Sequence, residues 1–353
     1  MKQEEIIKAF AQLGKLMVAL GEGAEWNGYE SGVTEEEYLT LKGIIGRQFF
    51  YNGWFTKENV QQALLALGSQ LTEEQLTVWV SRYNYSTNPK KVALIMAGNI
   101  PLVGFHDFLC AVISGNYAVC KLSSDDKTLL PALGHHLIQF LPELKNRIEF
   151  TTGRIGEVDA VIATGSDNSL KYFEQYFGKY PHIFRRNRTS IAVITGEETA
   201  EDFHELGNDI FNYYGLGCRN VSHLLVPRGF NLNRFFEGII QHGEVVNHNK
   251  YANNYDYNKA VFLLNQQELL DNNFVLLKES TDLFSPLAIV HYQYYDSKEA
   301  VENYLAEHKD QLQAIVGKNF IPFGKAQCPM LDDYADGVDT MAFLQTLSPL
   351  QNG

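Results

Sequence analysis

Apolar and polar positions divide the chain into a helical beginning and a longer part in which strand and helix patterns alternate. Before residue 91, apolar side chains recur at three- and four-residue spacing, which is the period of an amphipathic helix. The predicted helices cover Ile6–Leu20, Glu35–Phe50 and Glu58–Tyr83. Thr72, followed three residues later by Gln75, predicts a helix start with a capping box.

From residue 91, short apolar runs of strand length are separated by helical patterns. Residues 91–101, KVALIMAGNIP, predict a buried strand that ends in a Gly-Asn-Ile-Pro turn. A helix over Leu102–Ser114 and a strand over Tyr117–Lys121 complete a βαβ unit of about 30 residues, the usual size for a parallel pair. Further strands are predicted over Arg147–Thr151 and Asp159–Thr164, and further helices over Thr128–Leu141 and Ser169–Phe177. The alternation predicts an open parallel sheet that binds ligands at the carboxyl ends of its strands.

The second half of the chain repeats this alternation. Strands are predicted over Ser190–Thr195, Ser222–Val226, Ala260–Leu264 and Leu287–Tyr292, and helices over Ala200–Asn212 and Lys298–Lys309. The polar and aromatic stretch Asn247–Lys259 predicts a loop that is long enough to suggest a function. The basic run Arg185–Arg188 predicts a domain boundary.

Composition excludes two classes of protein. Of the 353 residues, 45% are apolar and 12% are aromatic, which is too much for a chain whose main state is disordered. The 29 basic and 42 acidic residues give a net charge of −13. This charge argues against nucleic acid as the main ligand, because such sites need clustered Lys and Arg. A local basic pocket for one phosphorylated cofactor stays compatible with it.

Cysteine usage and hydropathy indicate the compartment. Cys110, Cys120, Cys218 and Cys328 are too few and too scattered for a disulfide framework, and no pair has the spacing of a zinc site. The charged start MKQEEIIKAF predicts an amphipathic helix rather than a signal peptide. No apolar run approaches the roughly 18 residues that a membrane helix needs. We therefore expect a soluble cytoplasmic protein, without a bound metal, that forms homo-oligomers.

Cys218 is the first candidate for chemistry. It lies in Tyr213–Asn220 (YYGLGCRN), between a predicted helix and a predicted strand. Glycines beside it let the backbone approach a ligand, and a thiolate is a strong nucleophile towards carbonyl carbon. The neighbouring Arg219 can lower the pKa of the thiol. The alternative is a buried, unreactive cysteine in a tight turn.

Asn99 is the second candidate, because it follows a predicted strand in the stretch Ala97–Pro101. A side-chain amide at the end of a strand can donate a hydrogen bond to an oxyanion that develops during a reaction. The alternative is a purely local role, since Asn is a favoured turn residue before Pro.

Four motifs then follow one order along the chain: Asn99-x-Pro101, Lys121 at the end of the next strand, Thr164-Gly165-Ser166 after a later strand, and Gly215-x-x-Cys218. This order resembles the aldehyde dehydrogenase superfamily, and the resemblance spans about residues 90–290. The resemblance implies an α/β fold, with a Rossmann-type cofactor domain followed by a second α/β catalytic domain. In that superfamily the cysteine is the nucleophile, and its amide and the Asn-x-Pro asparagine form the oxyanion hole. The same roles are implied for Cys218 and Asn99.

The resemblance also implies a cofactor site. It assigns Lys121 to the adenine ribose and the segment of Thr164, Gly165 and Ser166 to the pyrophosphate. Residues 283–287 (LFSPL), which include Phe284, resemble the superfamily's Phe-Gly-Pro element. That match places Asp282 where a ribose-binding Glu usually lies.

A closer resemblance is to the fatty acyl-CoA reductases of luminescence-type systems. The stretches that carry it are Pro322–Gln327 and Leu331–Thr340, which resemble that family's C-terminal signature, together with Gly215–Asn220 and Lys250–Tyr257. It implies four parts of the chain: 1–90 as the N-terminal helical part of the cofactor domain, 91–185 as its Rossmann-like NADP-binding part, 186–330 as the catalytic domain with the nucleophilic Cys, and 331–353 as a C-terminal tail.

One departure from ordinary aldehyde dehydrogenases concerns hydrolysis. Those enzymes carry a Glu that acts as general base and activates water against the acyl-enzyme. Here the matching stretch, Phe184–Arg188, holds no carboxylate. Without that base a thioester should hydrolyse slowly, which suits a reaction in which a thioester must survive until hydride arrives.

A second departure concerns the cofactor. Lys121 is followed by LSSD without a Glu three positions on, and such a carboxylate would repel a 2′-phosphate. The hydroxyls of Ser123 and Ser124 would accept one. NADPH is therefore favoured and NADH stays possible. Asp125 and Asp126 would oppose NADPH if they faced the ribose.

The expected reaction is the NADPH-dependent reduction of a fatty acyl thioester to the aldehyde through a covalent acyl-cysteine at Cys218. The donor is acyl-CoA or an acyl group delivered by an acyl-transfer or acyl-activating protein. His223 and His248 are candidates for the proton transfers, with a structural role as the alternative for each. The residues that would line an acyl tunnel, with core packing as the alternative, include Phe105, Phe108 and Tyr213.

Three other functions use parts of the same pattern. A CoA-acylating aldehyde dehydrogenase would run the reaction in the oxidative direction, and an acyl-phosphate reductase would use the same cysteine on another donor. A non-catalytic acyl-binding subunit or scaffold would keep the fold without forming a covalent adduct. The direction of the reaction, the substrate and the adduct separate these functions.

Overall fold

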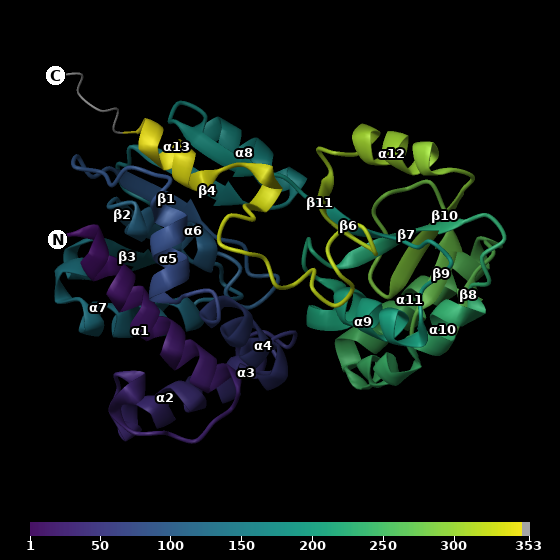
Figure 1. Ribbon diagram of the computed structural model, residues 1–353, viewed down its shortest axis with the longest axis horizontal. Helices are drawn as coiled ribbons and strands as arrows, with labels where there is room; N and C mark the ends of the chain where they lie inside the picture. The colour runs from purple at the N-terminus through teal and green to yellow at the C-terminus, as the bar shows by residue number, and fades with distance from the viewer. Residues whose placement is uncertain (348–353) are drawn as a thin grey trace. The chain divides into compact units, whose positions relative to one another are not determined.

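The computed structural model describes residues 1–347 and divides the chain into two compact units (Figure 1). The first unit contains Met1–Arg186 and the segment that begins at Met330, and the second contains Asn187–Pro329. Each unit is built around its own sheet. Residues 348–353 of the predicted C-terminal tail lie outside the described residues.

The first unit begins with helices, as predicted. They are α1 (Gln3–Gly21), α2 (Glu35–Gly46), α3 (Gln48–Tyr51), α4 (Lys57–Gly68) and α5 (Glu73–Val80). The side chains of Thr34, Thr56 and Thr72 cap α2, α4 and α5 by accepting a backbone N–H, which is why these helices begin where they do. The predicted helix over 58–83 is therefore two helices, because the chain turns after Gly68 and restarts at the Thr72 cap.

The helical layer is tied together by a close crossing of α1 and α4. Positions on α1 at helical spacing are buried, among them Ile6, Phe10, Leu13 and Met17. A Cβ on Gly68 would lie 2.8 Å from the Cβ of Met17, so only glycine allows the two backbones to approach this closely. The N-terminal helices thus form one core with the sheet of their unit.

The sheet of the first unit is parallel, which confirms the prediction. Its strands are β1 (Lys91–Ile95), β2 (Tyr117–Lys121), β3 (Ile148–Thr151), β4 (Ala160–Thr164) and β5 (His182–Arg185), in the order β3-β2-β1-β4-β5. The helices that connect strands are α6 (Phe105–Ile113), α7 (Leu129–Phe140) and α8 (Asp167–Phe177). The order reverses direction between β1 and β4, and ligands of open parallel sheets bind at such a switch point.

The sheet of the second unit has the order β11-β6-β7-β10-β9-β8. Its strands are β6 (Thr189–Val193), β7 (Val221–Pro227), β8 (Leu270–Asp271), β9 (Leu276–Glu279), β10 (Ile289–Tyr295) and β11 (Leu312–Val316). Its α-helices are α9 (Ala200–Phe211), α10 (Asn233–Gly238), α11 (Asn249–Leu264) and α12 (Lys298–Glu307). Neighbouring strands are parallel except for the antiparallel pair β8 and β9 at one edge.

Two predictions in the second unit are wrong. The expected loop Asn247–Lys259 and the expected strand Ala260–Leu264 together form the helix α11. Its buried residues are Tyr251 and Tyr255, one turn apart, so one narrow aromatic stripe holds it to the unit. Asparagines around the rest of the helix hide this stripe from a hydropathy pattern.

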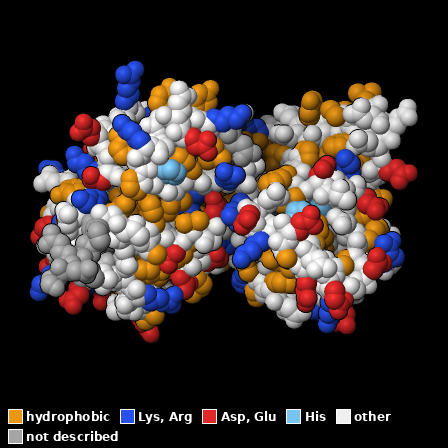
Figure 2. Space-filling model, turned by 90° about the horizontal axis from the view of Figure 1, so that it is seen from above, with side chains coloured by type: hydrophobic (Ala, Val, Ile, Leu, Met, Phe, Trp, Pro, Cys, Tyr) orange, Lys and Arg blue, Asp and Glu red, His pale blue; other side chains and the backbone are white. Residues whose placement is uncertain are grey.

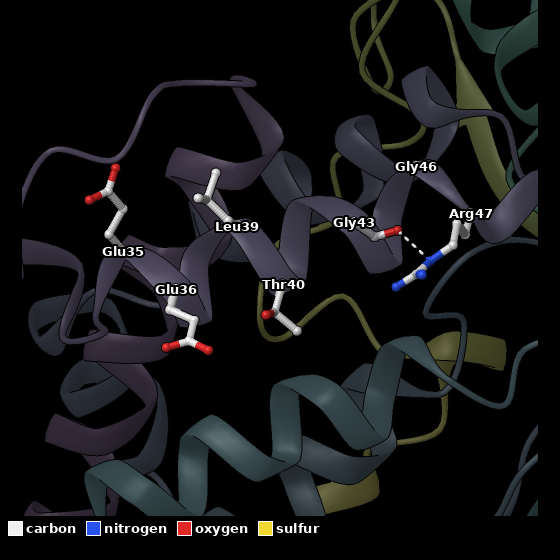
Figure 3. A pocket seen from close by; sticks show the side chains of 7 residues that line it. All are labelled: Glu35, Glu36, Leu39, Thr40, Gly43, Gly46 and Arg47. Atoms are coloured by element: carbon white, nitrogen blue, oxygen red, sulfur yellow. Dashed lines mark hydrogen bonds between the residues drawn. The ribbon is translucent and has the colours of Figure 1, made fainter.

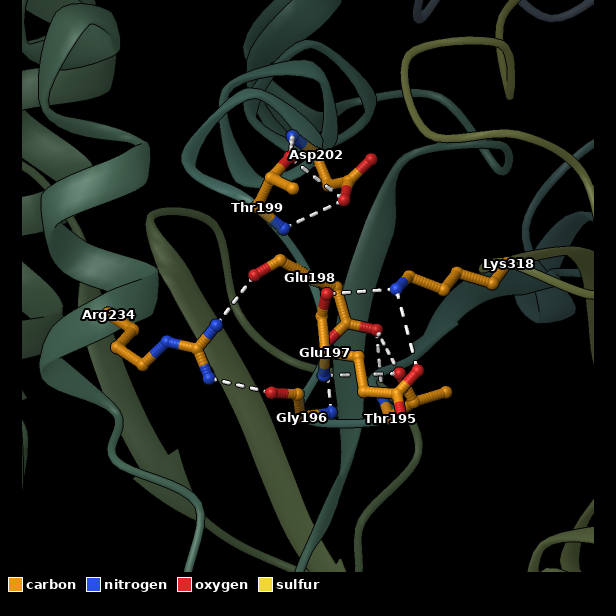
Figure 4. Close-up of polar contacts among 8 residues, drawn as sticks. All are labelled: Thr195, Gly196, Glu197, Glu198, Thr199, Asp202, Arg234 and Lys318. Atoms are coloured by element: carbon orange, nitrogen blue, oxygen red, sulfur yellow. Dashed lines mark hydrogen bonds and ion pairs between the residues drawn. The ribbon is translucent and has the colours of Figure 1, made fainter.

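The turn between β6 and α9 is closed by a buried carboxylate (Figure 4). Glu198 is only 2% exposed, and its oxygens accept hydrogen bonds from the backbone N–H groups of Thr195 and Gly196 at 2.8 and 2.9 Å. Arg234 donates to the backbone carbonyls of Gly196 and Glu198 from the other side. All of these groups satisfy one another, so the turn is a structural element.

The segment after Met330 is part of the first unit. The indole Nε1–H of Trp79 donates to the Tyr334 hydroxyl at 2.9 Å, and the helix α13 (Thr340–Thr346) packs on α6. Arg185, which is 3% exposed, pairs with Asp107 and donates to the Ala335 carbonyl at 2.6 Å. The stretch that resembles a C-terminal signature therefore has a structural role in this unit.

Two surface features complete the description. On the face drawn in Figure 2, basic and acidic side chains are interspersed. A hollow of about 750 Å³ lies on the exposed face of α2, and none of the predicted site residues lines it (Figure 3). Its lining consists of Glu35, Glu36, Leu39, Thr40, Gly43, Gly46 and Arg47. Among the described residues, no helix combines the length and the apolar character that crossing a membrane requires.

Candidate functional site

In the first unit, the predicted site residues gather at the carboxyl ends of three neighbouring strands. Asn99 follows β1 and is exposed, Lys121 ends β2, and Thr164 ends β4. The parallel register pairs Ile95 with both Lys121 and Ala163, so the turns that follow these strands lie at one edge of the sheet. This edge contains the switch point between β1 and β4.

The turn after β4 leads directly into the N-terminus of α8. Ser166 is the N-cap, and its hydroxyl accepts the backbone N–H of Ser169 at 3.4 Å. A Cβ on Gly165 would lie 2.8 Å from the Cβ of Ser169, so glycine is needed for this tight approach. A helix N-terminus presents N–H groups and positive potential, which fit a pyrophosphate.

Lys121 and the serines after it form the neighbouring loop. The Lys121 ammonium donates to the backbone carbonyl of Thr152, in the loop that follows β3. Ser123 accepts the N–H of Asp125 at 3.2 Å, and a Cβ on Gly98 would lie 2.6 Å from its hydroxyl. The loop of Ser123 and Ser124 therefore packs directly on the turn that carries Asn99.

The two acidic residues of this loop face different ways. Asp125 is exposed. Asp126 is 8% exposed and accepts the backbone N–H of Leu102 at 2.8 Å. Burial raises the pKa of Asp126 to about 6. Asp126 is therefore turned into the unit, and only Asp125 remains to oppose a 2′-phosphate.

In the second unit, Cys218 lies on the loop between α9 and β7, and its side chain is exposed. The chain reverses before it through three successive residues with positive φ: Tyr213 at 53°, Tyr214 at 58° and Gly215 at 78°. Such angles are unusual for residues other than glycine, so the loop is held by its surroundings.

Side-chain anchors fix the backbone on both sides of Cys218. Asn220 is 3% exposed; its carbonyl oxygen accepts the N–H of Gly217 at 2.8 Å, and its NH₂ donates to the carbonyls of Asp209 and Asn212. The Ser190 hydroxyl donates to the Cys218 carbonyl at 2.9 Å. The loop thus holds its backbone firmly while it presents the thiol to solvent.

A further anchor connects this loop to the stretch Pro322–Gln327. Asp209 is fully buried, and its two oxygens accept the N–H groups of Gly324 and Ala326 at 2.7 and 2.9 Å. Burial raises the pKa of Asp209 to about 6. Arg219 donates to the Ala326 carbonyl at 3.3 Å, which joins the two stretches. The sequence resemblance marked this stretch without revealing what it does.

The predicted ribose-binding residue Asp282 lies on a loop that is held by its backbone. The Asp282 carbonyl lies 2.8 Å from Nδ1 of His291 and 3.2 Å from Nδ1 of His223, and both nitrogens must donate because a carbonyl only accepts. The Asp282 side chain is exposed, and that of Phe284 is 41% exposed. The two histidines thus hold the backbone of the loop, and the side chains of Asp282 and Phe284 are exposed to solvent.

The two histidine candidates differ in position. His223 is fully buried beneath the Asp282 loop, and burial lowers its pKa to about 4, so its role is structural. His248 caps α11, and its ring stacks on that of Tyr214 with centroids 4.2 Å apart. His248 therefore lies beside the loop that carries Cys218.

The remaining candidates are core residues. Phe105, Phe108 and Tyr213 are buried, and Phe108 packs edge-on against Phe10 in the core of the first unit. For the two phenylalanines the core alternative is correct. Cys110 and Cys120 are also buried, which raises the pKa of both thiols well above the ordinary value.

The sequence did not reveal the anchoring roles of four residues, which are Ser190, Asn220, His291 and Asp126. Asn220 had one local signal, since it follows the Gly-x-x-Cys segment within two residues. Such anchors become visible only when the strands are placed side by side.

The fold is that of the aldehyde dehydrogenases. Aldehyde dehydrogenase 21 from Physcomitrella patens, in complex with succinate, matches with a TM-score of 0.67 at 12% identity, over 99% of this chain and 85% of that one. An aldehyde dehydrogenase from Mycobacterium tuberculosis complexed with NAD⁺ gives 0.62 at 13% identity, over 90% and 73%. An acetylating aldehyde dehydrogenase from Geobacillus thermoglucosidasius gives 0.57 at 12% identity, over 90% and 76%.

Sequence comparison defines the family within this fold. The model of the acyl-CoA reductase (LuxC) family matches residues 45–236, which is more than half of the 353 residues. The chain therefore belongs to the LuxC acyl-CoA reductase family. It is an oxidoreductase that acts on acyl or aldehyde groups. A search of curated protein sequences finds no match.

Proposed function

We propose that this protein reduces a fatty acyl thioester to the aldehyde with NADPH, through a covalent acyl group on Cys218. The observation that carries the proposal is the Cys218 loop, which exposes a thiol while Ser190 and Asn220 fix the backbone around it. A rigid loop with an exposed thiol suits a nucleophile, since effective attack depends on orientation.

The acylation step needs only the residues of this chain. The Cys218 thiolate attacks the thioester carbonyl of acyl-CoA, and the carbon–sulfur bond to CoA breaks, so that CoA leaves as a thiolate. Donors for the oxyanion are the Asn99 amide and the Cys218 N–H. Arg219, next to the nucleophile, favours the thiolate through its charge. Exchange of one thioester for another is nearly isoenergetic, so orientation and charge stabilisation are the main needs.

The cofactor proposal rests on the edge of the first sheet. Thr164, Gly165 and Ser166 lead into the N-terminus of α8, which suits the pyrophosphate. Lys121 and the hydroxyls of Ser123 and Ser124 suit the adenosine 2′-phosphate, and the inward orientation of Asp126 removes one of the two carboxylates that would repel it. Bound NADPH would supply the hydride that converts the acyl-cysteine to a thiohemiacetal, and NADH remains the alternative. Asp282 and Phe284 are proposed as further contacts.

The fate of the acyl-cysteine also supports reduction. Within Phe184–Arg188, Arg185 is buried and paired with Asp107, so this stretch offers water no general base. Collapse of the thiohemiacetal breaks the carbon–sulfur bond, releases the Cys218 thiolate and requires loss of the hydroxyl proton. His248 is proposed to accept that proton, because it stacks on Tyr214 beside the nucleophile loop.

The proposed setting follows the same chemistry. The donor is a fatty acyl-CoA or an acyl group carried by an acyl-transfer protein, and the protein acts as a homo-oligomer in the cytoplasm. The dispersed cysteines, of which Cys110 and Cys120 are buried thiols, suit a reducing compartment.

Intact-mass measurement after incubation with a panel of acyl-CoAs tests the proposal. We expect the protein to gain one acyl mass on Cys218 in the absence of NADPH, and to lose it as aldehyde when NADPH is added. Cys218→Ala should form no adduct and still bind NADPH. A folded wild-type protein that never forms the adduct would be a scaffold, and the proposal would be wrong.

Rates in both directions separate reduction from CoA-acylating oxidation. We expect NADPH oxidation with acyl-CoA to exceed NADP⁺ reduction with aldehyde and CoA at equal concentrations. The same panel run with NADH, with acyl phosphates and with candidate acyl-transfer proteins identifies the cofactor and the donor. Faster oxidation than reduction would assign the protein to the acylating dehydrogenases.

A further inference from the structure

Asp126 is a buried carboxylate that the proposed reaction does not use. It lies in the loop after β2, and Oδ2 accepts the backbone N–H of Leu102 at 2.8 Å. Its other oxygen, Oδ1, is buried and has no hydrogen-bond partner among the described residues. Burial of a carboxylate with one oxygen left without a partner costs stability, so its presence calls for a reason.

The turn that Asp126 holds is strained. Leu102 has a φ of 58°, a left-handed conformation that is unfavourable for a residue with a Cβ. Its side chain is buried and its N–H is fixed by Asp126, so the surroundings impose this conformation. Leu102 directly follows Asn99-Ile100-Pro101, and its conformation therefore sets the direction in which that segment leaves the strand.

The opposite end of the turn is fixed by Asn52, the residue after α3, which also contacts the loop of Asp126. The side-chain amide of Asn52 lies within 3.4 Å of the Gly98 carbonyl and 3.5 Å of the Asp125 carbonyl. Gly98 itself packs against Ser123. Asn99 is thus held between two anchored neighbours, Gly98 and Leu102, and its side chain remains exposed.

We propose that Asp126 is a positioning residue for Asn99: by fixing Leu102, it holds the Asn99 amide in the orientation that stabilises the oxyanion during acylation of Cys218. The inference rests on the proposed function and adds a residue that acts through Asn99 without touching the substrate. A displacement of about 1 Å in a group that contacts the reacting atoms can reduce a rate about 10²-fold, so a strained turn needs such a clamp.

The test is a double-mutant cycle on the acylation step alone. The measured quantity is the rate constant of CoA release in a single turnover with acyl-CoA and no NADPH. We expect Asp126→Ala to lower it about tenfold or more, and Asp126→Asn, which keeps an oxygen that accepts the Leu102 N–H, to lower it less than about threefold. In an Asn99→Ala background, Asp126→Ala should cost less than about twofold, because its route of action is gone.

A matched control separates positioning from general stability. Glu198 is also a buried carboxylate that accepts backbone N–H groups, and it belongs to the structural turn of the second unit (Figure 4). Glu198→Gln should lower the thermal midpoint and leave the acylation rate unchanged. A second readout is amide hydrogen exchange at Leu102, which should accelerate in Asp126→Ala and stay near the wild-type rate in Asp126→Asn.

The outcomes distinguish the inference from the proposed function. If Asp126→Ala lowers the rate constant of CoA release by the same factor with Asn99 and with Asn99→Ala, the inference is overturned. The proposed function then still stands, because Cys218 forms its adduct. A loss of NADPH affinity without a loss of acylation rate would also overturn it, because Asp126 would then serve the Ser123 and Ser124 loop. A wild-type protein that forms no adduct on Cys218 would overturn the proposed function, and the inference with it.

Discussion

The chemistry of the cysteines is set by where each side chain lies. Cys110 and Cys120 are enclosed by the core of the first unit, and burial raises the pKa of both thiols. Cys218 and Cys328 are exposed, and partial burial raises the pKa of Cys328. Because the thiolate is the reactive form, the four residues should differ widely in reactivity.

We expect iodoacetamide at pH 7 to alkylate Cys218 first, Cys328 more slowly, and the two buried cysteines only after unfolding. The order follows from exposure and from burial, which raises the pKa of Cys328 and of the two core cysteines. Peptide mapping after timed labelling measures it, and Cys328→Ser isolates the fast site. Modification of Cys110 in the folded protein at a rate similar to that of Cys218 would contradict the assignment.

Asn99 provides a second prediction for a single residue. We expect Asn99→Ala to lower the rate of Cys218 acylation by about 10²–10³, the usual loss when an oxyanion donor is removed. NADPH affinity should not change, because the turn lies beside the proposed cofactor residues without being one of them. Single-turnover CoA release and equilibrium NADPH titration measure the two quantities. A change in acylation rate below about threefold would remove Asn99 from the oxyanion hole.

Among the elements, the strands of the first unit were predictable and α11 was not. The runs that form β1, β2 and β4 are short, apolar and bounded by turn residues, which is typical of buried parallel strands. The helix α11 buries only two tyrosines, and its many asparagines are poor helix formers, so packing decides its conformation. The short strands β5, β9 and β11 also lacked a sufficient local signal.

The residues of the candidate site also fall into two groups, those that the sequence singled out and those that only the structure reveals. Cys218, Asn99 and Lys121 lie in local motifs, so their order along the chain was enough to single them out. The anchor Ser190 has no such pattern, because it meets the Cys218 loop only when β6 is placed beside β7. Sequence therefore singles out the candidate reacting groups, and tertiary structure is needed to identify the groups that hold them.

The Cys218 loop depends on the buried side chain of Asn220. We expect Asn220→Ala to destabilise the second unit by about 2–4 kcal/mol, because several backbone groups lose a buried hydrogen-bond partner. Urea denaturation measures this loss, and acylation of Cys218 should slow in the residual folded protein. Asn220→Asp keeps an acceptor for the Gly217 N–H but turns a second, non-donating oxygen towards the carbonyls that Asn220 pairs with, so it should destabilise the unit at least as much as Asn220→Ala. If Asn220→Ala lowers the free energy of unfolding by less than about 0.5 kcal/mol, the role of this anchor is contradicted.

For the whole molecule, histidines whose pKa is lowered by burial contribute to the loss of stability in acid. Burial lowers the pKa of His223 to about 4 and lowers those of His136, His242 and His291. In the unfolded chain these groups take up protons near their ordinary pKa of about 6.5, so the unfolded state binds more protons as the pH falls. Their contribution to stability is complete above about pH 6.5 and is lost as the pH falls towards 4.

A variant isolates the contribution of His223. Between pH 7 and 4.5 it should account for about 2–3 kcal/mol of the wild-type loss in the free energy of unfolding. In His223→Asn the side-chain NH₂ can still donate to the Asp282 carbonyl. The free energy of unfolding of this variant should therefore fall by about 2–3 kcal/mol less than that of the wild type between pH 7 and 4.5. Asp126 and Asp209, whose raised pKa values act in the opposite sense, are common to both proteins. Equal pH dependence in urea denaturation of the two proteins would contradict the prediction.

The chain returns to its first unit at Met330, and Arg185 is one of the residues that hold the returning segment. Its guanidinium pairs with Asp107 at 2.5 Å and donates to the Ala335 carbonyl and the Thr340 hydroxyl. Arg185→Met leaves the Asp107 carboxylate uncompensated in a largely buried place, so we expect a loss of about 3–5 kcal/mol in the stability of the first unit. Limited proteolysis should then cut within residues 330–347, which the wild type protects.

Two comparisons make this last prediction specific. Arg186, the next residue, has an exposed side chain, so Arg186→Met should change stability by less than about 0.5 kcal/mol and leave protection intact. The double variant Arg185→Met with Asp107→Leu removes both charges and should recover part of the loss, because the cost of a broken buried pair lies mainly in the charge left behind. Denaturation and proteolysis that respond alike to Arg185→Met and Arg186→Met would show that the ion pair does not hold the segment.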